Sequence, residues 1–568
     1  MIGVSTALAE NPQIAVLTMQ EAWRRLRRRL RTGPLHSLRF VGSAPERLAV
    51  IPPTLHQGDP FVAEAIYAGS FHLAGRLVEA GRGSIFQAPS PSDEFSAELH
   101  SFFWLRHHAA AGDALAIRNA RALVSDWLRH CSGRLGGPAF EPEVAARRLI
   151  AWLNHGDLLL GTADYEFYRR FLRSLSAQTR YLRSIAQEAP AGMPRLMVRM
   201  AIALAGVCLP MPSGRAKASV QHLADELDRQ ILPDGGHASR NPAALAAILA
   251  ELLPIRETLV NQGQPVPKGI YSAIDRMLPA LRFFRHADGT LALFNGTGAC
   301  EMQLLAALMR FDETLGEPLS NARHSGYHRL AADGTVVIAD TGCPPQVALS
   351  RSAHAGTLAF ELSSQAARIV VNCGSPQPGQ PELRRLSRST AAHSTVTVED
   401  RSSSRFAGQP QLDRFLGSPL VPGPTEVRVE EIAAEGSERT IGFDAAHDGY
   451  EREFGFLHQR RLQLSTDGAM LSGRDHLLAT RKPRGREDTK RAAIRFHLHP
   501  QVSVETIGDT ARLSLRGQLW RFSADRPFTV EDSIFFADNS GSRRTLQLVV
   551  EVDPGLTPEV AWAFERMS

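Results

Sequence analysis

The hydrophobic pattern of this chain changes from a helical to a strand period near its middle. Up to about residue 310, Ala, Leu and Arg recur at spacings of three and four, as in residues 61–81 and 242–260. From about residue 325, segments such as 334–340 and 456–465 alternate or run apolar between Gly, Pro, Asp and Ser residues, which is typical of antiparallel strands. Because elements segregated in this way cannot share one layered core, we predict an all-helical domain followed by an all-β domain.

The joint between the two halves is predicted within residues 314–328. This division gives a helical domain over residues 1–320 and an antiparallel β-domain over residues 321–568. Two segments of the second half, 373–390 and 479–493, are rich in polar and turn-forming residues. They are predicted to be loops, and the second an exposed hairpin tip.

Composition and sorting signals limit the class of protein. The longest apolar runs fall well short of the ~20 residues that a membrane-spanning helix needs. The N-terminal segment has no basic stretch leading into an apolar core and a cleavage site, so we expect a cytoplasmic location. The five cysteines are far apart and never form a C-x-x-C pair, which argues against a disulfide framework and against a thiolate zinc site.

The basic residues are almost all arginine. The net charge is +5, and only four of the 64 basic residues are lysine. Arginine forks suit carboxylate, sulfate and phosphate groups, so an acidic polymer is a candidate partner, although a GC-rich genome produces the same bias.

One arginine-rich segment, residues 21–31, is predicted to be a helix with Trp23, Leu26 and Leu30 on one stripe. Such a stripe more commonly packs on its own domain. The alternative is peripheral contact with a membrane surface or a polyanion.

Histidine is the side chain most suited to proton transfer near neutral pH. In the helical half, the turn formed by residues 234–236 precedes His237, with Arg240 and Asn241 just before a new helix at Pro242. This is an unusually polar interruption of an apolar helical array. The simpler alternative is an Asp-Gly-Gly turn with a solvated histidine.

In the β-half, His354, Asn372 and His393 lie on or beside three predicted strands and would converge if these strands are neighbours. Zinc prefers imidazole, thiolate or carboxylate ligands, so an amide in the third place makes a weak site. Hydrogen-bonded structural histidines are the more common alternative.

The order of these motifs resembles that of the heparinase II/III family of polysaccharide lyases. The resemblance covers residues 60–568, is clearest over 234–480, and depends on the segments DGGH, HAGTLAFE, VVNCG and AAHSTVTVED. It implies an α/α toroid followed by an antiparallel β-sandwich, with the substrate cleft between them. Such enzymes cleave uronate-containing polysaccharides, such as heparan sulfate or alginate, by β-elimination.

That reaction needs a base for the C5 proton, an acid for the departing oxygen at C4, and a group that neutralises the carboxylate. By match to the family motif, His237 falls where an Asn or His neutralises the carboxylate, and we add Arg240 as a candidate carboxylate clamp. His393 or a tyrosine would transfer the protons. Asn241 and Ser352 are candidate substrate contacts.

The chain departs from the family pattern in the β-half. Ser352 replaces a catalytic-type histidine, while the second histidine of that motif remains as His354. Asn372 replaces the aspartate of zinc-binding members, and the third ligand position falls on His393. The resemblance therefore implies no required cofactor, and zinc or another divalent metal only at a degenerate site formed by His354, Asn372 and His393.

The family's acid/base tyrosine aligns near Gly289, which cannot replace it. Among the seven tyrosines, Tyr450 follows a predicted turn and is the better substitute. Tyr271 is predicted to be a helix-packing residue.

Two functions follow from the resemblance. The first is a polysaccharide lyase acting on an acidic glycan, with an acidic polysaccharide and no nucleic acid as partner. The second is a catalytically degenerate protein of the same fold that binds glycans or helps to assemble the cell envelope. Family members that degrade external polymers are usually exported, so a periplasmic or cell-envelope location is the alternative to the cytoplasm.

Overall fold

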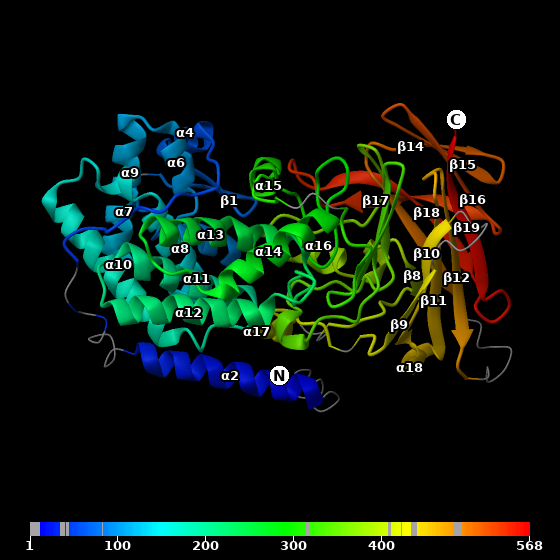
Figure 1. Ribbon diagram of the computed structural model, residues 1–568, viewed down its shortest axis with the longest axis horizontal. Helices are drawn as coiled ribbons and strands as arrows, with labels where there is room; N and C mark the ends of the chain where they lie inside the picture. The colour runs from blue at the N-terminus through cyan, green and yellow to red at the C-terminus, as the bar shows by residue number, and fades with distance from the viewer. Residues whose placement is uncertain are drawn as a thin grey trace.

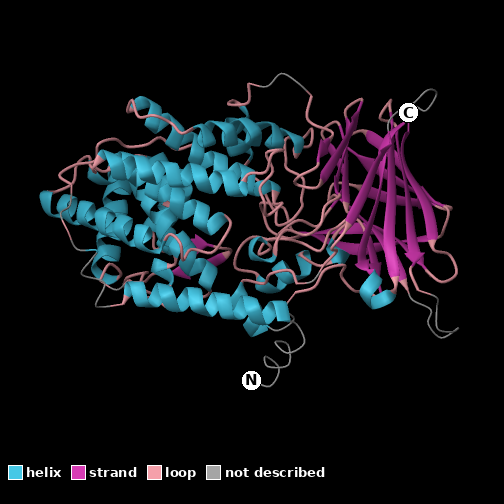
Figure 2. Ribbon diagram, turned by 60° about the horizontal axis from the view of Figure 1, so that its bottom comes forward, coloured by secondary structure: helices cyan, strands magenta, loops and turns pink. Residues whose placement is uncertain are grey.

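A computed structural model describes residues 12–33, 40, 42, 45–81, 83–133, 135–313, 317–406, 410–421, 423–432, 440–481 and 491–567. Helices occupy one end of the long axis and β-sheets the other (Figures 1 and 2). This order confirms the predicted fold class, an α/α toroid followed by an antiparallel β-sandwich. Within the described ranges, no helix is both long and apolar enough to cross a membrane.

The main helices of the first half are, in chain order, α2 (Pro12–Thr32), α4 (Pro60–Tyr67), α5 (Asp93–Ser101), α6 (Leu105–Ala111), α7 (Ala114–His130), α8 (Pro142–Asn154), α9 (Gly156–Leu160), α10 (Tyr165–Ile185), α11 (Met193–Cys208), α12 (Ser213–Gln230), α13 (Pro242–Asn261), α14 (Lys268–Phe283) and α15 (Met302–Met309). Helices α11 and α13 are buried over most of their length, so they pack inside the toroid. Helices α10 and α12 bury only one face, as their alternating apolar and charged residues require.

One expectation for this half is wrong. Residues 61–81 were predicted to be helical throughout, but α4 ends at Tyr67 and is followed by a hairpin of β1 (Ser70–Leu73) and β2 (Arg76–Glu79). The turn residues Ala74 and Gly75 both have positive φ values, 48° and 67°, as a two-residue hairpin turn requires.

Two antiparallel sheets form the second half. Their strands are β3 (Asn321–Ala322), β4 (Tyr327–Ala332), β5 (Thr335–Asp340), β6 (Phe360–Ser364), β7 (Ala367–Val371), β8 (Val396–Val398), β9 (Val427–Ile432), β10 (Thr440–Tyr450), β11 (Phe456–Ser465), β12 (Met470–Ala479), β13 (Ala492–Leu498), β14 (Ser503–Ile507), β15 (Thr510–Leu515), β16 (Gln518–Ala524), β17 (Phe528–Phe535), β18 (Arg543–Val552) and β19 (Glu559–Met567). Short helices α16 (Pro381–Ser387), α17 (Pro410–Leu416) and α18 (Glu451–Phe454) interrupt them.

In the described part of the chain, one sheet has the order β14-β15-β16-β19-β12-β11-β10-β9 and the other β17-β18-β13-β7-β6-β5-β4-β3, with β8 beside β13. Aromatic side chains join the two sheets, because Phe360 on β6 stacks on Trp562 of β19 with ring centroids 5.4 Å apart. This is the face-to-face packing of a β-sandwich.

The predicted loops need one correction. Residues 373–390 are not all loop, since α16 lies within them. Most of the second predicted loop, residues 482–490, lies outside the described residues.

The hydrophobic core of the helical half continues into the β-half. Tyr327, Val336, Ile338 and Ala359 from the first strands belong to the same buried cluster as the helices. Helix α15 ends at Met309, before β3 begins. The division at residues 320 and 321 stays a prediction, because one core spans both sides of it.

Candidate functional site

The turn predicted to carry function follows α12 and lies at the joint between the two halves. Gly235 has a φ of 82°, and a Cβ there would lie 1.9 Å from the Arg276 carbonyl oxygen, so only glycine fits. Asp234 accepts hydrogen bonds from the backbone N–H groups of Gly236 and Ser325. The turn is therefore fastened to the segment that enters the β-half.

His237 is buried, with only 1% of its surface exposed. Its Nδ1 lies 2.7 Å from Ser239 Oγ and its Nε2 lies 2.9 Å from Gln230 Oε1. Burial lowers the pKa of His237 to about 4, so the ring is neutral at pH 7. The alternative of a solvated histidine is wrong, and both ring nitrogens are already occupied by the protein. The role of carboxylate neutraliser stays a prediction, but this arrangement gives it no support.

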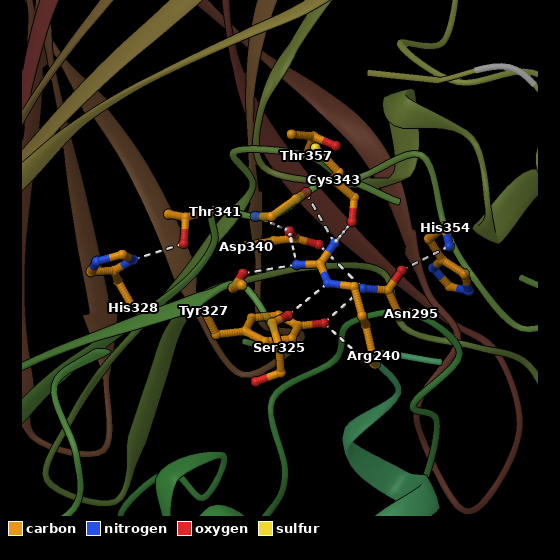
Figure 3. Close-up of polar contacts among 12 residues, drawn as sticks. Arg240, Asn295, Ser325, Tyr327, His328, Asp340, Thr341, Cys343, His354 and Thr357 are labelled. Atoms are coloured by element: carbon orange, nitrogen blue, oxygen red, sulfur yellow. Dashed lines mark hydrogen bonds and ion pairs between the residues drawn. The ribbon is translucent and has the colours of Figure 1, made fainter. Parts of the chain in front are cut away.

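Arg240 is the centre of the joint (Figure 3). Its backbone has a φ of 61°, and its guanidinium is buried above the Tyr327 ring, 4.8 Å from the ring centroid. The five N–H bonds of the guanidinium are donated to five protein oxygens, namely the carbonyl oxygens of Ser325, Gly326, Gly342 and Cys343 and the carboxylate of Asp340. Burial opposes the charged form, but Asp340 and Tyr327 raise the pKa of Arg240 above its usual value. The role of Arg240 as a carboxylate clamp stays a prediction, but this arrangement gives it no support, because all five N–H groups already have protein partners.

Three residues that the sequence did not single out complete this network. Asn295 Nδ2 donates to Tyr327 Oη at 2.7 Å and to Asp340 Oδ2 at 3.2 Å, while its Oδ1 accepts from the His354 backbone N–H. The Tyr327 hydroxyl in turn donates to the Arg240 carbonyl oxygen at 2.6 Å. In the sequence, the feature that pointed to this network was Asp340, a single carboxylate at the end of the apolar strand β5.

A second buried carboxylate, Glu361 on β6, strengthens the same joint. It accepts from Arg368 Nη2 at 2.7 Å and from the backbone N–H groups of Leu293 and Asn372, and it lies 3.1 Å from His286 Nε2. Burial alone would raise the pKa of Glu361, but the charge of Arg368 and the other donors lower it. Glu361 is therefore an ionised group that links the last loop of the helical half to the sheet.

The two candidate substrate contacts differ in their surroundings. Asn241 caps α13, since its Oδ1 accepts from the Ala243 N–H at 2.9 Å and from Thr297 Oγ1 at 3.0 Å. Its side chain therefore has a structural role at the helix start. Ser352 is half-buried next to Gly296, and its contact with a substrate stays a prediction.

His354 and His393 do come together, from the loops that precede β6 and β8. His354 Nδ1 lies 3.0 Å from His393 Nε2, and His393 Nδ1 donates to the Ser389 carbonyl oxygen at 2.7 Å. Burial lowers the pKa of both rings, to about 4 for His393. His354 Nε2 is buried without a hydrogen-bond partner.

These residues do not fit a zinc ion. The Asn372 Oδ1 already accepts a hydrogen bond from the Ser394 backbone N–H at 3.0 Å. The two imidazoles bond directly to one another, and across the described ranges no group of three or more His, Cys, Asp or Glu side chains is arranged to hold a metal. A neutral amide in the third position leaves the ligand set short of what zinc prefers.

The candidate acid/base tyrosine is inside the sandwich. Tyr450 is buried, and its hydroxyl donates to the Val396 carbonyl oxygen at 2.7 Å. Burial raises its pKa. Tyr271, in contrast, is exposed on α14, and Gly289 forms a turn with a φ of 87°. The acid/base role of Tyr450 stays a prediction, and its buried, bonded hydroxyl gives that role no support.

Comparison with known proteins decides the family. Residues 314–563 match the model of the heparinase II/III-like C-terminal domain. The chain is 32% identical over 554 residues to FtsZ-localized protein C of Caulobacter vibrioides, which covers 94% of this chain and 93% of that protein. The chain belongs to the heparinase II/III-like family.

Solved structures show the heparinase II/III-like fold. Heparinase III superimposes with a TM-score of 0.71 at 13% identity, over 94% of this chain and 88% of that one. A mutant of the heparan sulfate lyase HepC from Pedobacter heparinus superimposes with a TM-score of 0.60 at 15% identity, over 100% of this chain and 91% of that one. Chondroitin AC lyase of Streptomyces coelicolor superimposes with a TM-score of 0.53 at 11% identity, over 97% of this chain and 83% of that one. The chain therefore shares the fold of these polysaccharide lyases. Sequence identities of 11–15% do not show that it shares their activity.

The first prediction concerns the joint. We expect Arg240→Ala to lower the free energy of unfolding by about 3–5 kcal/mol, because it leaves the buried Asp340 without its counter-charge. Urea unfolding followed by circular dichroism measures this. The control is Arg173→Ala, which removes an exposed arginine on α10. Equal stability of Arg240→Ala and the wild type would contradict the structural role of Arg240.

The second prediction concerns pH. Burial holds the pKa of His237, His286 and His393 at about 4 in the folded protein, whereas an unfolded chain binds protons near pH 6.5. The contribution of these neutral histidines to the free energy of unfolding is then fully present above about pH 6.5. It decreases as the pH falls toward 4, by about 1.4 kcal/mol per pH unit for each such histidine.

Urea titrations between about pH 7.5 and pH 5 measure this slope. The variant His237→Gln is expected to reduce the slope, because it removes one histidine whose pKa burial lowers. A flat stability profile for the wild type would show that the buried histidines are not held neutral.

Proposed function

We propose that this chain is a catalytically degenerate member of the family that works at a membrane surface in cell-envelope assembly. The observation that carries the proposal is an exposed apolar stripe on α2. Met19 is 67% exposed and Trp23 53% exposed, and the other members of the stripe are also exposed, namely Val16, Leu26 and Leu30. These positions are three or four residues apart, so they lie on one face of the helix.

Arginines attach the helix to the rest of the protein. Arg24 donates to the Glu188 carbonyl oxygen, Arg28 pairs with Glu141 at 2.6 Å, and Arg31 pairs with Glu188 at 3.0 Å. Figure 1 shows α2 along the outside of the helical half. The expectation that Trp23, Leu26 and Leu30 pack on their own domain is therefore wrong. The alternative, peripheral membrane contact through this helix, becomes part of the proposal.

The flanking charges suit an anionic lipid surface. Arg27 and Arg29 are exposed beside the stripe, and Arg27 lies over the Trp23 ring at 5.1 Å from its centroid. An amphipathic helix binds a membrane by burying its apolar face while basic residues contact the headgroups. Helix α2 combines both features on a helix held by a folded body.

The relative from Caulobacter vibrioides supports a location together with FtsZ. Its name says that it is localised with FtsZ, and we carry this location over to the present chain.

The second candidate is β-elimination in a uronate-containing polysaccharide, which the shared fold favours. It requires a base, an acid and a carboxylate neutraliser that reach the substrate. His237, His393 and Tyr450 are instead buried, with polar atoms bonded to the protein. We therefore place the degenerate function first.

The third prediction tests membrane contact. We expect the purified chain to co-sediment with phosphatidylglycerol vesicles, and the double variant Trp23→Glu/Leu26→Glu to lose this binding by at least about tenfold, since each buried apolar side chain contributes about 1.5–3 kcal/mol. The control is Val260→Glu, which introduces the same charge at an exposed apolar position on α13. Absence of wild-type binding, or equal losses in both variants, would contradict the proposal.

A further inference from the structure

A basic cavity lies on the flank of the helical half, away from the joint. Its volume is about 860 Å³. Its lining comes from α2, α10, α11 and α12 and from Phe40, and includes the charged and polar side chains of Arg31, Arg180, Arg183, Ser184, Arg199, Arg215, Ser219 and His222. No carboxylate is among the lining residues in the part of the chain that the structure describes.

Two of the lining arginines donate hydrogen bonds to neutral groups around the cavity. Arg180 Nε donates to the Phe40 carbonyl oxygen at 2.9 Å, and Arg183 Nη2 lies 3.3 Å from Ser219 Oγ. Arg199 is only 8% exposed, and its Nε is buried with no hydrogen-bond partner. An unpaired buried donor of a cation is costly unless an anion or water meets it.

The nearest carboxylates lie outside the lining. Glu188 pairs with the lining residue Arg31 at 3.0 Å. Glu226 bonds Arg229 and Gln230, and its charge raises the pKa of Arg199 against the larger opposite effect of burial. Burial and the charges of Arg215 and Arg180 lower the pKa of Arg183, which reflects repulsion among like charges. A bound anion would relieve this repulsion.

We propose that this cavity binds a phosphate group with more than one negative charge, the chemistry shared by a phosphomonoester lipid headgroup and a soluble phosphate ester. Several guanidinium forks can contact the tetrahedral oxyanion together, and the hydroxyls of Ser184 and Ser219 add donors. The volume suits a whole phosphorylated molecule.

The cavity is separate from the cleft expected for a lyase. Its α12 residues, Arg215 to His222, belong to the first half of that helix, whereas the turn at His237 follows its last residue. Arg31 at the end of α2 connects the cavity to the proposed membrane helix. The inference does not depend on membrane binding, because the cavity would serve a soluble phosphate ester equally well.

The test is isothermal titration calorimetry of the full chain with inorganic pyrophosphate. We expect saturable binding, weakened at least about tenfold by Arg183→Gln and by Arg199→Gln, because each removes a charge-assisted hydrogen bond. The matched control is Arg173→Gln, an exposed arginine on α10 outside the lining. If Arg199→Gln does not fold, Arg215→Gln at the exposed rim replaces it. No wild-type binding, or an equal loss in the control, would overturn the proposal.

Vesicles containing phosphatidic acid distinguish the two sources of phosphate. If Arg183→Gln weakens both pyrophosphate binding and vesicle binding, the ligand is a lipid headgroup. If it weakens only pyrophosphate binding, the ligand is a soluble phosphate ester. Pyrophosphate binding by a chain that ignores all vesicles would support this site while overturning the membrane function.

Discussion

The rest of the structure depends on one buried cation, the guanidinium of Arg240. It joins the turn before α13 to backbone and side-chain oxygens that lie 85 to 103 residues further along the chain. A buried arginine is favourable only when its donors are all satisfied and its charge is met, and both conditions hold here through four carbonyl oxygens and Asp340. Glu361, ion-paired with Arg368 within the sheet, adds hydrogen bonds to the helical half through the Leu293 N–H and His286. The helical half and the sheets thereby form one continuous core.

This constraint also affects the motifs that resemble those of a lyase. The cleft of such an enzyme lies between the toroid and the sandwich, where His237, Arg240 and the His354–His393 pair are found. In this chain the same polar groups bond to one another and to backbone carbonyls, and burial keeps the histidines neutral. The exposed apolar stripe of α2 and the arginine-lined cavity are the features on which the proposed binding functions rest. The molecule has the fold of polysaccharide lyases.

Much of the fold could be predicted from the sequence, because the spacing of hydrophobic residues along a local segment distinguishes a helix from a strand. The change near residue 320 and the antiparallel strands follow from it, whereas His354 and His393 approach one another from loops before β6 and β8, which are not neighbouring strands. The β1–β2 hairpin was missed because its apolar spacing also satisfies a helix. The role of Arg240 could not be predicted, since its acceptors are mostly backbone carbonyls brought near by tertiary folding. The face of α2 that is exposed also depends on tertiary contacts, because the arginines of α2 bond to Glu141 and Glu188, which are distant in sequence.

The most direct test of the account is to incubate the purified chain with heparan sulfate, hyaluronan, chondroitin, alginate and polyglucuronate and to follow the ultraviolet absorbance of the unsaturated uronate. β-Elimination forms this chromophore with every such polymer, so a single readout covers the class. If the chain is catalytically degenerate, as we propose, a folded sample gives no increase in absorbance. An increase that His237→Ala or His393→Ala abolishes, while the variant remains folded, would show that these histidines reach a substrate and would contradict it.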